Sequence, residues 1–210
     1  SSINPVILMP EALKARGEKV AGELAASVVL GAGQFCTNPG LVLGIRSPEF
    51  SAFLHSLTAK MAEQPPQTLL NAGGLEGYGK GIAALAAHPG ITHLAGAAQE
   101  GKQARPQLFK ADVSLLLEGD ERLQEEVFGP TTIVVEVADQ AELLEAVKGL
   151  HGQLTATLIT EPGDLAGSEE LFALLEQKVG RVLFNGYPTG VEVCDLSLIH
   201  ISEPTRPLYI

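Results

Sequence analysis

The sequence is poor in the residues that mark several large classes of protein. It has two cysteines and no tryptophan among 210 residues, and aromatic residues make up 5% of the chain. Two cysteines are too few for the disulfide framework of a small secreted domain, so a cytoplasmic location is expected. No run of 18 or more apolar residues occurs, and the sequence therefore contains no candidate for a transmembrane helix.

Basic residues are also scarce. The chain has 14 Lys and Arg against 25 Asp and Glu, which gives a formal net charge of −11. Nucleic acids and anionic membrane surfaces are both bound through basic patches, so neither is an expected partner. The hydrophobic content of 45% is typical of a globular protein with a core, and the length suits one sizeable domain.

Short apolar runs alternate with amphipathic segments along the chain. The predicted strands cover 4–10, 40–48, 91–97, 107–118, 131–139, 155–161 and 181–186. The predicted helices cover 11–31, 49–64, 77–88, 140–150 and 167–179, and 62–79 is expected to be largely a surface loop. This alternation predicts an α/β fold with a mostly parallel, twisted sheet and helices on both faces. Ligands of such sheets bind at loops beyond the carboxyl ends of the strands.

The first loop with candidate chemistry is GAGQFCTNPG, residues 31–40, which carries Cys36. Gly33 allows a sharp turn before the cysteine, and Asn-Pro-Gly after it is typical of a second turn. A thiolate on a loop can be activated by backbone N–H groups or a nearby positive charge. Cysteine is also among the most buried residue types, and that tendency alone favours an inert Cys36.

Two further segments combine turn residues with polar groups. LQEEVFGPTTIVVE, residues 123–136, places two adjacent carboxylates before a Gly-Pro turn. One carboxylate could bind a sugar hydroxyl or act as an acid or base, although composition alone favours a solvated acidic pair at the end of a helix. RVLFNGYPTGVEVC, residues 181–194, is a strand followed by turn residues, and a turn alone accounts for it.

The order of the three segments resembles the catalytic domain of the NAD(P)-dependent aldehyde dehydrogenases. VLGAGQFCTNPG (29–40) is similar to the cysteine signature of that superfamily, and EEVFGP (125–130) to its Glu-x-Phe-Gly-Pro motif. LFNGYPTGV (183–191) lies where the family has a Gly-x-x-x-x-Asn strand and loop. The resemblance covers residues 1–194, and it is greatest to the branch that acts on 2-oxoglutarate semialdehyde (2,5-dioxovalerate).

The resemblance implies a mechanism and a set of site residues. The Cys36 thiolate attacks the aldehyde to form a thiohemiacetal, hydride passes to NAD or NADP, and water activated by a glutamate releases the acid. Glu126 is implied to hold the nicotinamide ribose, and Phe128 to pack near the nicotinamide ring. The implied supports of the nucleophile loop and the substrate are Gln34, Thr37 and Asn185. No metal is implied, because the five histidines, His55, His88, His93, His151 and His200, lack ligand spacing.

The sequence departs from the family pattern at both ends. It begins at SSINP, just after the position of the family's general-base glutamate, so that residue, the cofactor domain and the oxyanion asparagine are expected to be missing. Residues 195–210 do not continue the pattern, and we expect a non-native tail after a catalytic-domain fragment at 1–194, with a divergent native C-terminus as the alternative. The family also implies a homo-oligomer, and this chain lacks the oligomerisation segments. We therefore expect little or no dehydrogenase activity from the chain itself.

Two other functions remain open at this point. A CoA-acylating or phosphorylating semialdehyde dehydrogenase shares the thioacyl step but uses another acceptor. The residue at the position of the missing glutamate distinguishes the two, because a hydrolytic enzyme needs that base. A non-catalytic α/β binding module with an inert Cys36 is the alternative from another class.

We predict that Cys36 reacts faster than Cys194 with iodoacetamide, because a nucleophile loop offers its thiolate N–H groups that an ordinary thiol lacks. Mass spectrometry after brief, substoichiometric labelling measures the ratio of the two adducts. Equal labelling of the two thiols would count against a preformed nucleophile loop.

Overall fold

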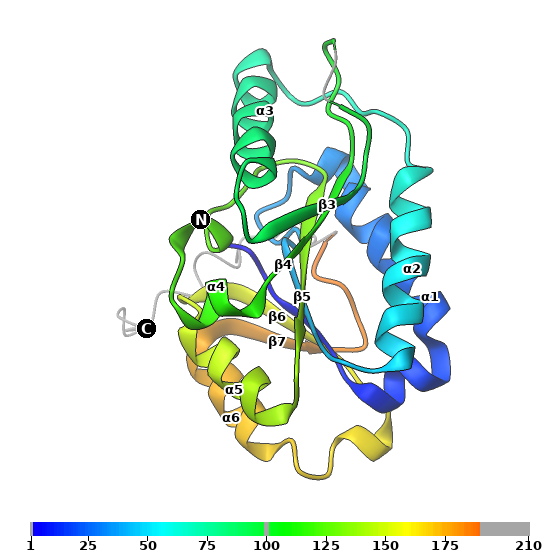
Figure 1. The fold of residues 1–210 in the computed structure, drawn as a ribbon, viewed down its shortest axis with the longest axis vertical. Helices are drawn as coiled ribbons and strands as arrows, with labels where there is room; N and C mark the ends of the chain where they lie inside the picture. The colour runs from blue at the N-terminus through cyan, green and yellow to red at the C-terminus, as the bar shows by residue number, and fades with distance from the viewer. Residues whose placement is uncertain (1, 99–100, 190–210) are drawn as a thin grey trace, which may run out of the picture.

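The computed structural model describes residues 2–98 and 101–189, which form a single seven-stranded sheet between helices (Figure 1). The strand order is β3-β4-β5-β2-β1-β6-β7. The strands are β1 (Val6–Leu8), β2 (Leu41–Ile45), β3 (Ile91–Ala95), β4 (Gln107–Ala111), β5 (Thr131–Val137), β6 (Gln153–Ile159) and β7 (Val179–Phe184). Neighbouring strands are parallel except for β3 and β4, which are antiparallel. The predicted α/β fold with a mostly parallel sheet is confirmed.

The helices cover both faces of the sheet. α1 (Pro10–Val29) and α2 (Pro48–Ala62) pack together on one face, while α4 (Val113–Leu117), α5 (Gln140–Gly149) and α6 (Glu169–Lys178) lie on the other (Figure 1). Each face has its own apolar core. Successive side chains of a strand point to opposite faces, so Val6 and Leu8 of β1 join the core beneath α1 and α2, and Ile7 joins the other.

Two predicted elements differ from the structure. The strand predicted at 107–118 ends at Ala111, and the apolar residues after it form α4, because a short apolar run does not by itself distinguish a strand from a buried helix. The helix predicted at 77–88 is α3 (Ala72–Ala86), so the last part of the predicted loop is helical. The Asn71 side chain accepts a hydrogen bond from the Gly74 N–H (2.7 Å), and this N-cap starts the helix despite its glycines.

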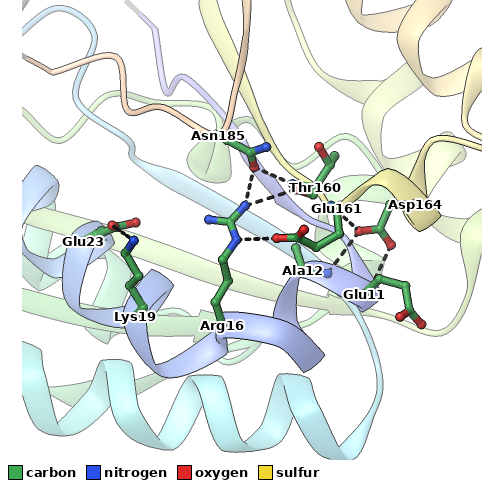
Figure 2. A network of polar contacts seen from close by, with 9 residues as sticks. All are labelled: Glu11, Ala12, Arg16, Lys19, Glu23, Thr160, Glu161, Asp164 and Asn185. Atoms are coloured by element: carbon green, nitrogen blue, oxygen red, sulfur yellow. Dashed lines mark hydrogen bonds and ion pairs between the residues drawn. The ribbon is translucent and has the colours of Figure 1, made fainter.

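The N-terminus of α1 is capped from a distant part of the chain. Its own N-cap residue, Met9, has no side chain to accept a hydrogen bond. Instead the Asp164 carboxylate, 7% exposed, accepts the N–H groups of Glu11 (2.9 Å) and Ala12 (3.1 Å), as Figure 2 shows. A negative charge here satisfies N–H groups that lack helical partners and complements the helix dipole.

A second set of polar contacts fixes a break in α1 at Arg16, whose backbone is not helical (φ −152°, ψ 30°). The Arg16 guanidinium donates to Glu161 Oε1 (2.7 Å), to the Thr160 carbonyl (3.1 Å) and to Asn185 Oδ1 (Figure 2). Thr160 and Asn185 directly follow β6 and β7. The first turns of α1 are therefore fastened to the carboxyl ends of these two strands.

Asp164→Ala should lower the free energy of unfolding by about 1–3 kcal/mol, because the N–H groups of α1 lose a buried charged acceptor. Asp139→Ala is a matched control, since Asp139 is an exposed N-cap whose side chain accepts, among the described residues, the Glu142 N–H within α5 and no other. We expect that control to lose about 0.5–1 kcal/mol. Urea denaturation followed by circular dichroism measures both losses, and equal losses would show that the long-range cap adds nothing.

Candidate active site

The loop that carries Cys36 lies at the amino ends of β1 and β2. α1 returns the chain from the carboxyl end of β1, and the short helix η1 (Leu30–Gly33) and residues 34–40 then lead into Leu41, the first residue of β2. The expectation that the chemistry lies at the carboxyl ends is wrong for this loop, because a helix-to-strand connection in a parallel sheet ends at the amino edge. Cys36 itself is exposed and forms no disulfide.

Cys36 occupies a tight turn. The Asn38 N–H donates to the Phe35 carbonyl (3.0 Å), which makes Cys36 and Thr37 the two central residues of a four-residue turn. The N–H groups of central turn residues are not used by the turn's own hydrogen bond. The exposed thiol of Cys36 is therefore carried on a tight turn, where a reactant can reach it.

The cysteine loop contacts the EEVFGP segment through backbone atoms. Gly33 has a φ of +66°, and a Cβ at this position would lie 2.3 Å from the carbonyl carbon and oxygen of Gly129. No side chain fits in that space, and the positive φ also favours glycine. On the same side, Asn38 Nδ2 donates a long hydrogen bond to the Gly129 carbonyl (3.4 Å). The cysteine loop and the EEVFGP segment are therefore in direct contact.

A buried tyrosine supports this contact from behind. A Cβ at Gly129 would lie 2.3 Å from Cδ2 of Tyr78, so the ring of Tyr78 is packed against the glycine. The Tyr78 hydroxyl donates to the Arg105 carbonyl (2.6 Å) and lies 3.3 Å from the Pro130 carbonyl oxygen. Burial raises the pKa of the Tyr78 hydroxyl, which keeps it protonated and able to donate.

Glu126 and Phe128 lie just before β5, at the same edge of the sheet as Cys36. Glu126 is partly buried, and this burial raises the pKa of its carboxyl group, while a hydrogen bond from the Ser2 N–H lowers it by a smaller amount. Phe128 is 41% exposed. An aromatic ring and a partly desolvated carboxylate thus stand next to each other on the edge that carries the cysteine.

A small pocket lies between the two motifs. Its lining residues are Ser2, Ile3, Gly33, Asn38, Gly40, Leu85, Leu123, Glu125, Glu126, Val127, Phe128, Thr131 and Ile133. Asn38 is 9% exposed, and its Oδ1 atom has no hydrogen-bond partner among the described residues. Both this unpaired carbonyl oxygen and the Glu126 carboxylate accept hydrogen bonds, and the pocket's volume of about 20 Å³ holds about one water molecule. Asn38 was interpreted from the sequence only as a turn residue, because the sequence gives no sign of its burial.

Gln34 and Thr37 fasten the cysteine loop to its surroundings. Gln34 Oε1 accepts the Leu70 N–H (2.8 Å), which links the loop to the segment before α3. The buried Thr37 hydroxyl donates to the Pro188 carbonyl (2.8 Å), which links it to the segment after β7. Both side chains hold the backbone on either side of Cys36.

Asn185 lies at the opposite edge of the sheet. Its Oδ1 atom accepts the Thr160 N–H (2.9 Å) and an Arg16 N–H (Figure 2). The backbone of Asn185 has a positive φ of 54°. The registers of β6 with β1 and with β7 give its distance from the cysteine loop. Asn185 lies beside the end of β6, about four residues, or roughly 13 Å, further along that strand than the level of the cysteine loop. The structure therefore brings five of the six expected site residues to the amino edge and places Asn185 apart from them.

Some expected features concern absences or residues outside the described part. Within residues 2–98 and 101–189, no group of three or more His, Cys, Asp and Glu side chains is placed to hold a metal ion. Over the same residues, no helix has the length and apolarity needed to cross a membrane. Cys194, His200 and the predicted tail at 195–210 lie outside the described residues, so the boundary at 194 stays a prediction.

Gly33→Ala should lower the free energy of unfolding by at least about 2 kcal/mol, because the new methyl group overlaps the Gly129 backbone and the φ is positive. Gly79→Ala is the matched control: it lies in α3, and a Cβ there meets nothing within 4 Å. We expect this control to be neutral or stabilising by up to about 1 kcal/mol. Chemical denaturation measures both, and a harmless Gly33→Ala would mean that the two motifs do not pack this closely.

The curated proteins that are similar to the chain in sequence include two semialdehyde dehydrogenases, while no protein-family model matches it. The alpha-ketoglutaric semialdehyde dehydrogenase of Acinetobacter baylyi is 53% identical over 202 residues, which are 95% of this chain and 38% of that protein. The alpha-ketoglutaric semialdehyde dehydrogenase 2 of Azospirillum brasilense is 42% identical over the same shares. The chain thus spans less than two fifths of the length of these relatives.

Solved structures show the same fold. The delta-pyrroline-5-carboxylate dehydrogenase of Mycobacterium tuberculosis matches 91% of this chain and 36% of its own, with a TM-score of 0.75 and 19% identity. The gamma-glutamyl-gamma-aminobutyraldehyde dehydrogenase of Burkholderia cenocepacia matches 90% and 39%, with a TM-score of 0.71 and 20% identity. The chain is therefore similar in sequence to part of two alpha-ketoglutaric semialdehyde dehydrogenases, and its fold is that of solved aldehyde dehydrogenases.

Proposed function

We propose that this chain is the nucleophile-bearing part of an enzyme that oxidises 2-oxoglutarate semialdehyde to its carboxylic acid with NAD or NADP. One observation carries the proposal: the exposed Cys36 turn and the Glu126 segment meet at one edge of the sheet through the contact between Gly33 and Gly129. The names of the two relatives in sequence support the substrate. By analogy with the family, the complete protein is a cytoplasmic homo-oligomer.

Cys36 begins the reaction. Its thiolate attacks the aldehyde carbon, a C–S bond forms, and the carbonyl electrons move to the oxygen, which becomes an oxyanion. Preorganised N–H groups stabilise such an oxyanion, and the central N–H groups of the turn at Cys36 and Thr37 are candidates for this role. The exposure of Cys36 leaves its thiol open to a substrate.

We propose, from the family resemblance, that the segment before β5 contacts the ribose and the nicotinamide ring of the cofactor. Glu126 and the unpaired Asn38 oxygen accept hydrogen bonds from hydroxyl groups, and Phe128 offers a ring to pack against. When bound, NAD or NADP supplies the acceptor for the hydride that leaves the substrate carbon. The described residues contribute the binding and the orientation of that carbon on Cys36.

Hydrolysis of the resulting thioester completes the cycle. Water attacks the acyl carbon, the C–S bond breaks, and the acid leaves with Cys36 again a thiolate. The base for this water is a glutamate that the family resemblance places just before Ser1. Because the base and the cofactor domain belong to the remaining part of the relatives, we propose that the 210-residue chain alone has little or no activity.

A chimeric enzyme tests the proposal. The chain replaces the matching residues of the Acinetobacter baylyi relative, and NAD(P)H formation with 2-oxoglutarate semialdehyde is followed at 340 nm. We expect turnover without added CoA or phosphate. Cys36→Ser should lower the rate at least about 10³-fold, whereas Cys194→Ser, the change at the chain's other cysteine, should not.

Four outcomes would contradict the proposal. A folded chimera without turnover, or one that stays active after Cys36→Ser, would remove the nucleophile assignment. A requirement for CoA or phosphate would identify an acylating enzyme instead. Turnover by the isolated 210-residue chain at an ordinary enzymatic rate would show that the missing part is not needed.

A further inference from the structure

Asn4 joins the Cys36 loop to the centre of the sheet. It lies two residues before β1, is 1% exposed, and has a φ of +44°. Asparagine is one of the few residues other than glycine that adopts a positive φ readily. The backbone here is therefore turned so that a short amide side chain is buried between β6 and the loop.

Every hydrogen-bonding group of this amide has a partner. Nδ2 donates to the carbonyl oxygens of Cys36 (2.9 Å) and Asn38 (3.0 Å). Oδ1 accepts from Ser2 Oγ (2.9 Å) and from the N–H and hydroxyl of Thr155 (both 3.2 Å). Since an amide has only two donor hydrogens and one carbonyl oxygen, the group is fully used, and two of its five contacts go to the cysteine turn.

We propose that Asn4 is a positioning residue for the nucleophile. It holds the carbonyl of Cys36 inward, and in a trans peptide the N–H of the next residue, Thr37, points in the opposite direction. The Thr37 N–H is thereby fixed on the outer side of the turn, where the Cys36 thiol is exposed. This inference rests on the proposed function, in which Cys36 is the attacking group.

Without the clamp, the peptide between Cys36 and Thr37 is free to rotate. Rotation brings the Cys36 carbonyl oxygen toward the thiol side and takes the N–H away from it. The dipole next to a thiolate or an oxyanion is then reversed from attractive to repulsive. Cys36 is already exposed, so loosening the turn does not make its thiol more accessible to a reagent. The expected effect on the reactivity of Cys36 is therefore a decrease.

The test uses the 210-residue chain with Cys194→Ser, so that alkylation by iodoacetamide reports Cys36 alone. Asn4→Gly removes the clamp, suits the positive φ and introduces no charge. We expect the second-order rate constant at pH 7.5 to fall about tenfold, as for a thiolate that loses local stabilisation. The unfolding midpoint in urea is recorded for every variant.

Thr155→Val is the matched control. It removes one donor to Asn4 Oδ1 from the β6 side and leaves both contacts from Nδ2 to the loop intact. We expect it to lower the unfolding midpoint and to leave alkylation within about twofold of the parent. A merely structural role for Asn4 predicts that both variants slow alkylation in proportion to their loss of stability.

The outcomes separate this inference from the proposed function. If Cys36 of the Cys194→Ser chain reacts no faster in the folded protein than in urea, both the proposed function and the role of Asn4 are overturned. If it reacts faster when folded and Asn4→Gly leaves that rate unchanged, or slows it no more than Thr155→Val, only the role of Asn4 is overturned.

Should Asn4→Gly fail to fold, Asn4→Asp replaces it in the same comparison. Aspartate also tolerates the positive φ, keeps the oxygen that faces Ser2 and Thr155, and loses the donors to the loop. A slowing that persists in 1 M salt reports the lost clamp, because salt screens the added charge. A slowing that vanishes in salt overturns the role of Asn4.

Discussion

The close approach of two backbones at Gly33 and Gly129 is the constraint on which the candidate site depends. A side chain at either glycine would overlap a neighbour, the Gly129 backbone in one case and the Tyr78 ring in the other. The cysteine loop and the segment before β5 therefore pack as one unit. The positions of Cys36 and Glu126 follow from this backbone contact, and their own side chains remain available for chemistry.

The fold class could be predicted from the sequence, but the order and direction of the strands in the sheet could not. Buried parallel strands are near-continuous apolar runs, so β2, β5 and β6 could be predicted from composition. The run after Ala111 was predicted as part of a strand and forms α4 instead, because a short apolar run can form either element. The antiparallel pairing of β3 with β4, and the insertion of β1 between β2 and β6, depend on contacts between segments far apart in the chain.

Much the same division holds for the candidate site. The order of the sequence motifs predicted Cys36, Glu126 and Phe128 as site residues, and the structure places all three on one edge of the sheet. That edge was not the expected one, since the rule for ligand sites does not cover helix-to-strand loops. The contacts of Asn4, Asn38 and Asn185 bridge up to 169 residues of sequence, and a single sequence gives no sign of such pairings.

The central place of β1 has a consequence for how the chain folds during synthesis. β1 is the only link between the β3-β4-β5-β2 part of the described sheet and β6-β7. Its residues are made before those of the other described strands, and β6 begins about 145 residues later, which at typical translation rates is roughly 7–30 s. During that delay Val6, Ile7 and Leu8 lack one neighbouring strand. The nascent chain therefore leaves a fully buried apolar segment without one of its two neighbouring strands until β6 is made.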